Sequence, residues 1–160
     1  MAFVKYAVVA LLGAALFAGP ALADQAETAK AAGKDASWLF IQTAPTIKFD
    51  GKTLTLQNIN PSVTMFTDRP ARVAEAIATA AFVKNWDKGT TKSFKSDPPN
   101  AGLTSIVDGK LQTATVELSH PQMEGMTLRY DVRVVNGEVP ASGGPTSLFI
   151  DQIHFGPGPN

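Results

Sequence analysis

Hydrophobic and polar residues alternate in short runs over most of the chain after Trp38. The clearest run is residues 128–134, in which Leu, Tyr, Val and Val alternate with Arg, Asp and Arg. A period of two is typical of a strand that buries one face. Turn pairs separate such runs at Asp50-Gly51, Asp108-Gly109 and Asn136-Gly137. These pairs predict tight turns between antiparallel neighbours.

The spacing of runs and turns predicts a mainly β fold. We expect strands at residues 38–43, 46–49, 53–57, 63–66, 103–107, 114–118, 128–134 and 147–154, and loops at 121–125 and 141–145. Short strands at this spacing favour an antiparallel β-sandwich or a related barrel.

An inserted helical segment interrupts the β pattern. Asp68 is a helix-capping residue type, and Pro70 would occupy the first turn, where its missing N–H costs nothing. Residues 71–86 are rich in Ala, Arg, Glu and Lys. Four apolar residues in this stretch share one face at helical spacing: Val73, Ile77, Ala80 and Ala81.

A second short helix is expected to start at Thr79, whose hydroxyl is a capping group. It would carry Phe82, Val83 and Trp86. Because the surrounding turns are rich in Ala, the two aromatic rings are the main groups that can dock this helix on a sheet. We therefore predict that Phe82 and Trp86 belong to the core.

The amino terminus has the layout of a secretory signal peptide over residues 1–23. Lys5 is followed by an uncharged apolar run at residues 6–17 and by an A-x-A site at Ala21-Leu22-Ala23. The apolar run is shorter than the roughly 20 residues that a bilayer-spanning helix needs. We therefore expect export to the periplasm or the medium, with no transmembrane span in the mature chain.

The remaining organisation is simple. Residues 24–37 hold no large apolar side chain and predict a mobile arm. A single domain is expected over residues 38–155, followed by a loose Gly/Pro tail at 156–160.

The 14 basic and 14 acidic residues balance, which argues against nucleic-acid binding. The absence of Cys excludes disulfides and thiolate chemistry.

Four segments carry a resemblance. They are DRP-x-R at residues 68–72, an aromatic stretch ending in Trp at 82–86, DPPNA at 97–101 and SGGP-x-SLFID at 142–151. With these segments the chain resembles exported bacterial proteins of uncharacterised function. The resemblance covers residues 38–152; it implies a single exported domain and brings no catalytic residue with it.

Charged and polar residues of two of these segments are the candidate binding residues: Asp68, Arg69, Arg72, Asp97 and Asn100. A structural role is the alternative, because Asp68 can cap a helix and an Arg can bridge to Asp97 between two loops. Four lysines near this region could receive an anionic partner, or could simply form a solvated face: Lys84, Lys88, Lys92 and Lys95.

A copper site is an alternative interpretation of the segment around His120, Met123 and Met126. One imidazole and two thioethers suit Cu(I), and no other cofactor is indicated. The three groups converge only if the segment makes a helical turn or a tight loop. Gly125 and the alternation that follows it favour a hairpin, in which Met126 points away and the methionines fill the edge of the core.

Catalytic signatures are weak. His120 and His154 are the only histidines, and no G-x-S-x-G elbow is present for a serine triad. A hydrolase with dispersed carboxylates remains an alternative. The sequence favours an exported, non-catalytic binding or accessory module, whose partner is a protein or a small molecule.

The export prediction has a direct test. We expect signal cleavage after Ala23, so that the mature chain begins at Asp24. Mass spectrometry of the amino terminus after expression with a secretion pathway measures this. A chain that keeps Met1 and stays in the cytoplasm would contradict the prediction.

Overall fold

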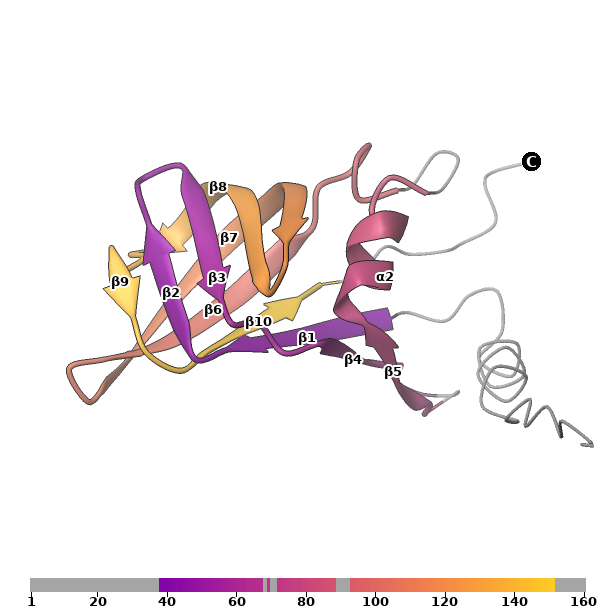
Figure 1. Cartoon of the computed structure of the whole chain (residues 1–160), viewed down its shortest axis with the longest axis horizontal. Coiled ribbons are helices and arrows are strands. Elements are labelled where there is room, and N and C mark those ends of the chain that lie inside the picture. Colours follow the sequence, from indigo (N-terminus) through magenta and orange to yellow (C-terminus); the bar gives the residue numbers. More distant parts are fainter. Residues whose placement is uncertain (1–37, 68, 70–71, 89–92, 152–160) are drawn as a thin grey trace, which may run out of the picture.

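Ten antiparallel strands form one sheet in the computed structural model of the chain, which describes residues 38–67, 69, 72–88 and 93–151 (Figure 1). The strands are β1 (Trp38–Ala44), β2 (Thr46–Phe49), β3 (Thr53–Gln57), β4 (Ser62–Thr67), β5 (Ala74–Ala78), β6 (Asn100–Val107), β7 (Lys110–Glu124), β8 (Thr127–Gly137), β9 (Ser142–Gly143) and β10 (Thr146–Ile150). Their order in the sheet is β5-β4-β1-β10-β6-β7-β8-β3-β2-β9. The mainly β prediction is confirmed.

The alternating runs place one face of each strand in the core. In β3, Leu54 and Leu56 are fully buried, while the residues that alternate with them are half-buried. Leu128 and Tyr130 of β8 are also fully buried. The predicted buried face of residues 128–134 fades beyond Tyr130, because Val132 is half-buried and Val134 is 40% exposed.

Local turn chemistry forms two of the predicted hairpins. Between β2 and β3, the Asp50 carboxylate accepts hydrogen bonds from the backbone N–H groups of Thr53 (2.7 Å) and Lys52 (2.9 Å). These bonds favour the charged carboxylate and lower the pKa of Asp50. Between β6 and β7, Asp108 and Gly109 both have positive φ, as a two-residue hairpin turn requires.

The expected loop at residues 121–125 is wrong, because β7 continues to Glu124. The register against β8 shifts between Ser119 and Gln122, where His120 has a φ of 47°. Pro121 has no N–H for the ladder, so the strand passes it by an irregular pairing instead of ending. The chain reverses at Gly125 and the next residue.

The Asn136-Gly137 turn is also wrong, since both residues pair with β7 at the end of β8. Another register shift lies beside them, between Thr115 and Val116. Gly137 has a φ of 78°, and glycine adopts such positive φ values in tight turns and in irregular strands alike. Here the left-handed backbone conformation of Gly137 lies at the irregular end of β8 and not in a turn.

The first part of the predicted helical segment, before Thr79, is not a helix. Residues 74–78 form β5, which pairs with β4 from Ser62↔Ala78 to Phe66↔Ala74. Val73 and Ile77 are four positions apart, a spacing that places two residues on one face of either a helix or a strand. Pairing with β4 therefore overrides the helix propensity of the alanines. Asp68 and Pro70, the expected helix start, lie outside the described residues.

The second predicted helix is confirmed as α2 (Thr79–Asn85), although Thr79 does not cap it. Thr79 is the first helical residue, and its N–H donates to the Pro61 carbonyl (2.8 Å). Its hydroxyl donates to the Asn60 carbonyl at 2.6 Å. The helix start is thus fixed to the loop before β4.

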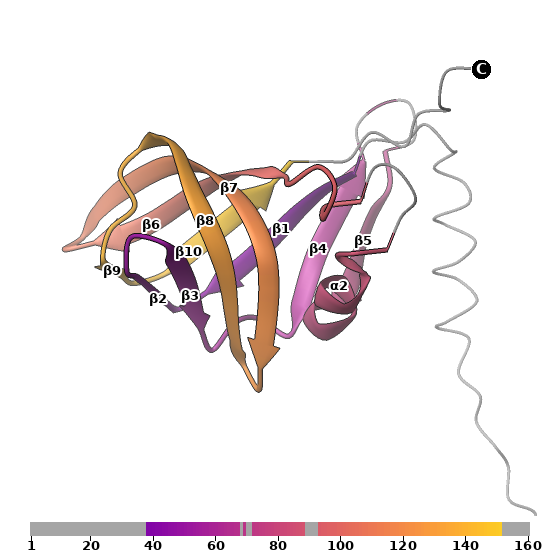
Figure 2. The ribbon, with the colours of Figure 1, turned by 90° about the horizontal axis from the view of Figure 1, so that it is seen from above.

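The sheet curls until β9 lies against the end of β6 (Figures 1 and 2). The Gly144 N–H donates to the Ile106 carbonyl (2.8 Å), and the Ile106 N–H donates to the Pro145 carbonyl (3.1 Å). Edge strands β5 and β9 remain unpaired with each other, so the sheet is open. Closure into a sandwich or a barrel is not confirmed.

Helix α2 packs on the core face of this curl, where it contacts β4, β5 and β7 (Figure 2). Its buried rings Phe82 and Trp86 join the apolar residues of the strands in one core cluster. Their predicted core position is confirmed. In the part of the chain that the structure describes, no helix has the length and apolarity to cross a membrane.

The contact between β9 and β6 predicts the effect of one methyl group. A Cβ at Gly143 would clash with the Ser105 hydroxyl, which is buried and accepts a hydrogen bond from Thr146 (2.8 Å). Gly143→Ala is therefore expected to lower the free energy of unfolding by about 2 kcal/mol. Gly102→Ala is the control, since its Cβ would meet only the Phe149 Cβ at 3.9 Å. Urea denaturation that gives equal values for both variants would contradict the packing of β9.

Candidate functional site

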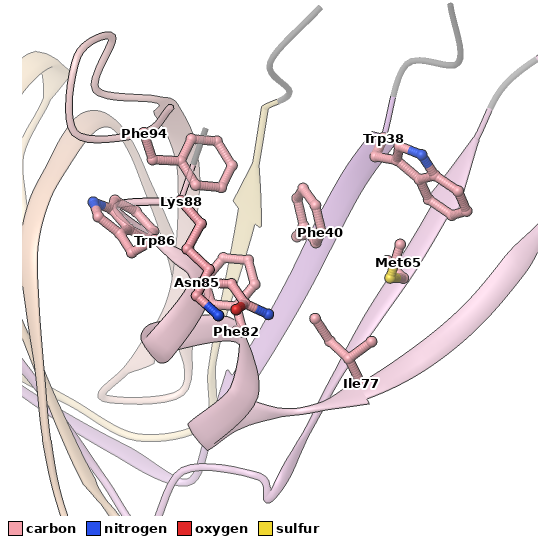
Figure 3. A pocket seen from close by; sticks show the side chains of 9 residues that line it. All are labelled: Trp38, Phe40, Met65, Ile77, Phe82, Asn85, Trp86, Lys88 and Phe94. Atoms are coloured by element: carbon pink, nitrogen blue, oxygen red, sulfur yellow. The ribbon is translucent and has the colours of Figure 1, made fainter. Parts of the chain in front are cut away.

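An apolar cavity of about 290 Å³ lies between α2 and one end of the sheet (Figure 3). Strands β1, β4 and β5 form one side, and α2 with the residues after it forms the other. The lining residues are Trp38, Phe40, Met65, Ile77, Phe82, Asn85, Trp86, Lys88 and Phe94.

Aromatic rings on the helix side form a connected wall. Ring centroids are 5.7 Å apart for Phe82 and Trp86, 6.0 Å for Phe82 and Phe94, and 4.6 Å for Trp86 and Phe94. Tilted and edge contacts at these distances are favourable ring geometries. Because each ring is held by its neighbours, this wall is formed without a ligand.

The opposite wall is less buried. Phe82, Trp86 and Phe94 are at most 8% exposed, whereas Trp38 and Phe40 of β1 are half-buried. Met65 and Ile77 are half-buried as well. The cavity thus joins a core-like wall to apolar surface that solvent can reach. A guest molecule would remove this surface from water, which is favourable.

A buried polar pair stands behind the aromatic wall. The Trp86 ring lies 5.5 Å from the Tyr130 ring, and the Tyr130 hydroxyl donates to Gln42 Oε1 at 2.9 Å. Burial raises the pKa of Tyr130, so this hydroxyl stays protonated as a donor. Gln42 Nε2 is buried without a hydrogen-bond partner. The hydrogen bond links the Gln42 side chain of β1 to Tyr130 of β8, while the Nε2 group of the same amide stays unsatisfied, which is unfavourable.

A second, more polar cavity of about 430 Å³ lies on the other side of Trp86 and Phe94. Both rings also line this cavity. The other lining residues are Val83, Lys84, Asp87, Lys95, Pro98, Ser119, His120, Pro121 and Gln122. The charged groups are partly paired, with Lys95 Nζ at 3.5 Å from Asp87 Oδ2. Trp86 therefore separates an apolar compartment from a charged one.

His120 lies at this polar cavity and faces a carboxylate. Its Nδ1 is 3.3 Å from Asp131 Oδ2, and its side chain is 73% exposed. A carboxylate at Nδ1 orients an imidazole, as in hydrolytic triads. Among the hydrogen bonds of the described residues, however, no hydroxyl contacts this ring, and Ser119 donates to the Asp131 carbonyl.

The copper alternative gains no geometric support. Met123 packs against the core, opposite buried Leu128, whereas His120 extends to solvent beside Asp131. Met126 is 53% exposed at the turn between β7 and β8. His120 is thus exposed at the register shift of β7, where regular alternation is interrupted, whereas Met123 after the shift packs on the core.

The predicted binding residues that the structure describes are not among those that line the apolar cavity. Arg69, Arg72, Asp97 and Asn100 are exposed, and none of them lines it. No ion pair of the described residues joins Arg72 to Asp97. Asp68 lies outside the described residues.

Sequence reasoning found only part of this site. It identified Phe82 and Trp86 as core residues and noted a lysine cluster, but it did not connect them to Trp38, Met65 and Ile77. The lysines separate in the structure: Lys88 lines the apolar cavity, while Lys84 and Lys95 line the polar one. One feature of the sequence could have indicated the site: residues 38–41 at the start of β1 are all large and apolar, and one face of a strand cannot bury all four.

Comparisons of the chain with protein families, with curated proteins and with solved structures found no match.

The aromatic wall predicts a large effect of its central ring. Trp86→Ala should lower the free energy of unfolding by roughly 3–5 kcal/mol, because the ring is 3% exposed and contacts both Phe94 and Tyr130. Half-buried Trp38 provides the control, and Trp38→Ala should cost clearly less. Chemical denaturation measures both values. A loss below about 1 kcal/mol for Trp86→Ala, as for a surface change, would show that the wall is not part of the core.

Proposed function

We propose that this protein is an exported, non-catalytic binding module that holds a small apolar molecule between α2 and strands β1, β4 and β5. The cavity at this place carries the proposal. Seven of its nine lining residues are apolar or aromatic, and only Asn85 and Lys88 bring polar groups. Ligand sites have this composition: mostly apolar walls with a few polar groups that fix orientation.

The size of the cavity limits the ligand. Its volume of about 290 Å³ lies at the lower end of the range for small-molecule sites, which begins at roughly 300 Å³. A single chain or a small ring system fits this limit better than a large cofactor. The strand-side lining residues Met65 and Ile77 are half-buried, so solvent reaches this side of the cavity.

Binding is favoured over hydrolysis by what lines the cavities. Among the described residues, no carboxylate lines the apolar cavity, and Asp87 is the one carboxylate that lines the polar cavity. Hydrolysis by an acid pair needs two carboxyl groups that face one substrate. Export is supported by the signal-peptide pattern of residues 1–23.

Fluorescence tests the binding function directly. Trp38 and Trp86 are the only tryptophans of the chain, and both line the cavity, so tryptophan emission reports on its occupancy. The neutral apolar dye N-phenyl-1-naphthylamine should bind saturably, with a rise in its own emission. Ile77→Gln places an amide in the apolar wall and should weaken dye binding about tenfold.

Ala76→Gln is the matched control, because Ala76 is exposed on the other face of the same strand. It should bind the dye as the unchanged chain does. Circular dichroism and urea denaturation show that each variant is folded. A folded protein without saturable dye binding, or an Ile77→Gln variant with unchanged affinity, would exclude this cavity as the site.

A further inference from the structure

We propose that the ligand is a single-chain amphiphile with an anionic head group, whose tail lies in the apolar cavity and whose carboxylate meets Lys88. This inference rests on the proposed binding function and specifies its ligand class. It follows from which charges the fold places at the cavity and which it places elsewhere.

Lys88 is the only charged residue among the nine that line the cavity. Its backbone N–H donates to the Asn85 carbonyl (2.9 Å), so the chain turns at the end of α2 and places both residues on the helix side. Figure 3 shows the Asn85 and Lys88 side chains near each other, across from Met65 and Ile77. One ammonium and one amide thus belong to exposed residues that line an otherwise apolar cavity.

The Lys88 ammonium is available for a ligand. Lys88 is exposed, and it forms no ion pair with any residue in the described part of the chain. Lys95, by contrast, pairs with Asp87 in the polar cavity. Lys84 also lines that polar cavity and not the apolar one. Of the residues that the structure describes, Lys88 is therefore the one unpaired cation that lines the apolar cavity.

Glu75 is the competing charge and would favour a cationic guest. It pairs with Met65 across β4 and β5, and its Oε1 is buried without a hydrogen-bond partner. Glu75 does not line the cavity, however, whereas Lys88 does. A head group at the entrance would thus meet the ammonium directly. Aromatic rings can also attract a cation, so the choice of sign needs its own measurement.

The head-group contact should be modest in strength. An ion pair at an exposed rim is weakened by water and by salt, whereas apolar burial of the tail provides most of the affinity. The Lys88 charge therefore affects the choice between ligands with different head groups more than it affects the overall affinity. Raised ionic strength should reduce this selection without abolishing tail binding.

Three ligands with the same tail test the inference: dodecanoate, dodecanol and dodecyltrimethylammonium. Each competes with N-phenyl-1-naphthylamine for the full chain, at concentrations below micelle formation. We expect dodecanoate to bind most tightly. Lys88→Ala should weaken dodecanoate by roughly three- to tenfold and leave dodecanol within about twofold, because only the carboxylate uses the ammonium.

Two variants provide controls. Lys88→Arg keeps the charge and should retain the preference for dodecanoate. Lys84→Ala removes a lysine of α2, four residues before Lys88, that lines the other cavity, and it should change none of the three affinities. Loss of the dodecanoate preference in the Lys84 variant would place the head group in the polar cavity and overturn the assignment to Lys88.

The outcomes separate the two proposals. Equal binding of all three ligands would leave the binding function intact and overturn the anionic head group. A preference for the ammonium ligand that disappears in Glu75→Gln would assign the head-group site to Glu75 and would also overturn it. If neither the dye nor any of the three ligands binds to the folded chain, the binding function itself fails.

Discussion

The contact between the rings of α2 and the core face of the sheet is the constraint on which the rest of the structure depends. A sheet that curls without closing leaves apolar side chains on its open side, and these must be covered. Phe82 packs on Phe40 of β1, and Trp86 packs on Tyr130 of β8. The helix thereby joins two distant parts of the sheet, and it gives them a common core.

The same helix is too short to cover the whole opening. Its seven residues extend only about 10 Å, which leaves Trp38, Met65 and Ile77 half-buried at the β5 edge. The apolar cavity is the space that this incomplete cover leaves. The same rings thus have two positions in the structure: they belong to the core, and they line the apolar cavity.

Several elements could be predicted from neighbouring residues alone. The Asp50-Gly51 and Asp108-Gly109 hairpins form as expected, because a carboxylate and positive φ angles act within a few residues. The errors have physical reasons too. Val73 and Ile77 fit either a helix or a strand at a spacing of four, and only β4 makes residues 74–78 a strand. Pro121 interrupts the ladder of β7 without ending the strand.

The sequence by itself determined the buried positions of β3 and of the start of β8, the turns at Asp50-Gly51 and Asp108-Gly109, and the burial of Phe82 and Trp86. Periodicity and turn chemistry are properties of short segments. The tertiary structure alone decided which lysine meets the apolar cavity and which residues surround it. Trp38, Met65 and Ile77 become neighbours of Trp86 only through the strand order β5-β4-β1 and the return of α2 across it. Such adjacency depends on long-range pairing, which no local pattern of residues specifies.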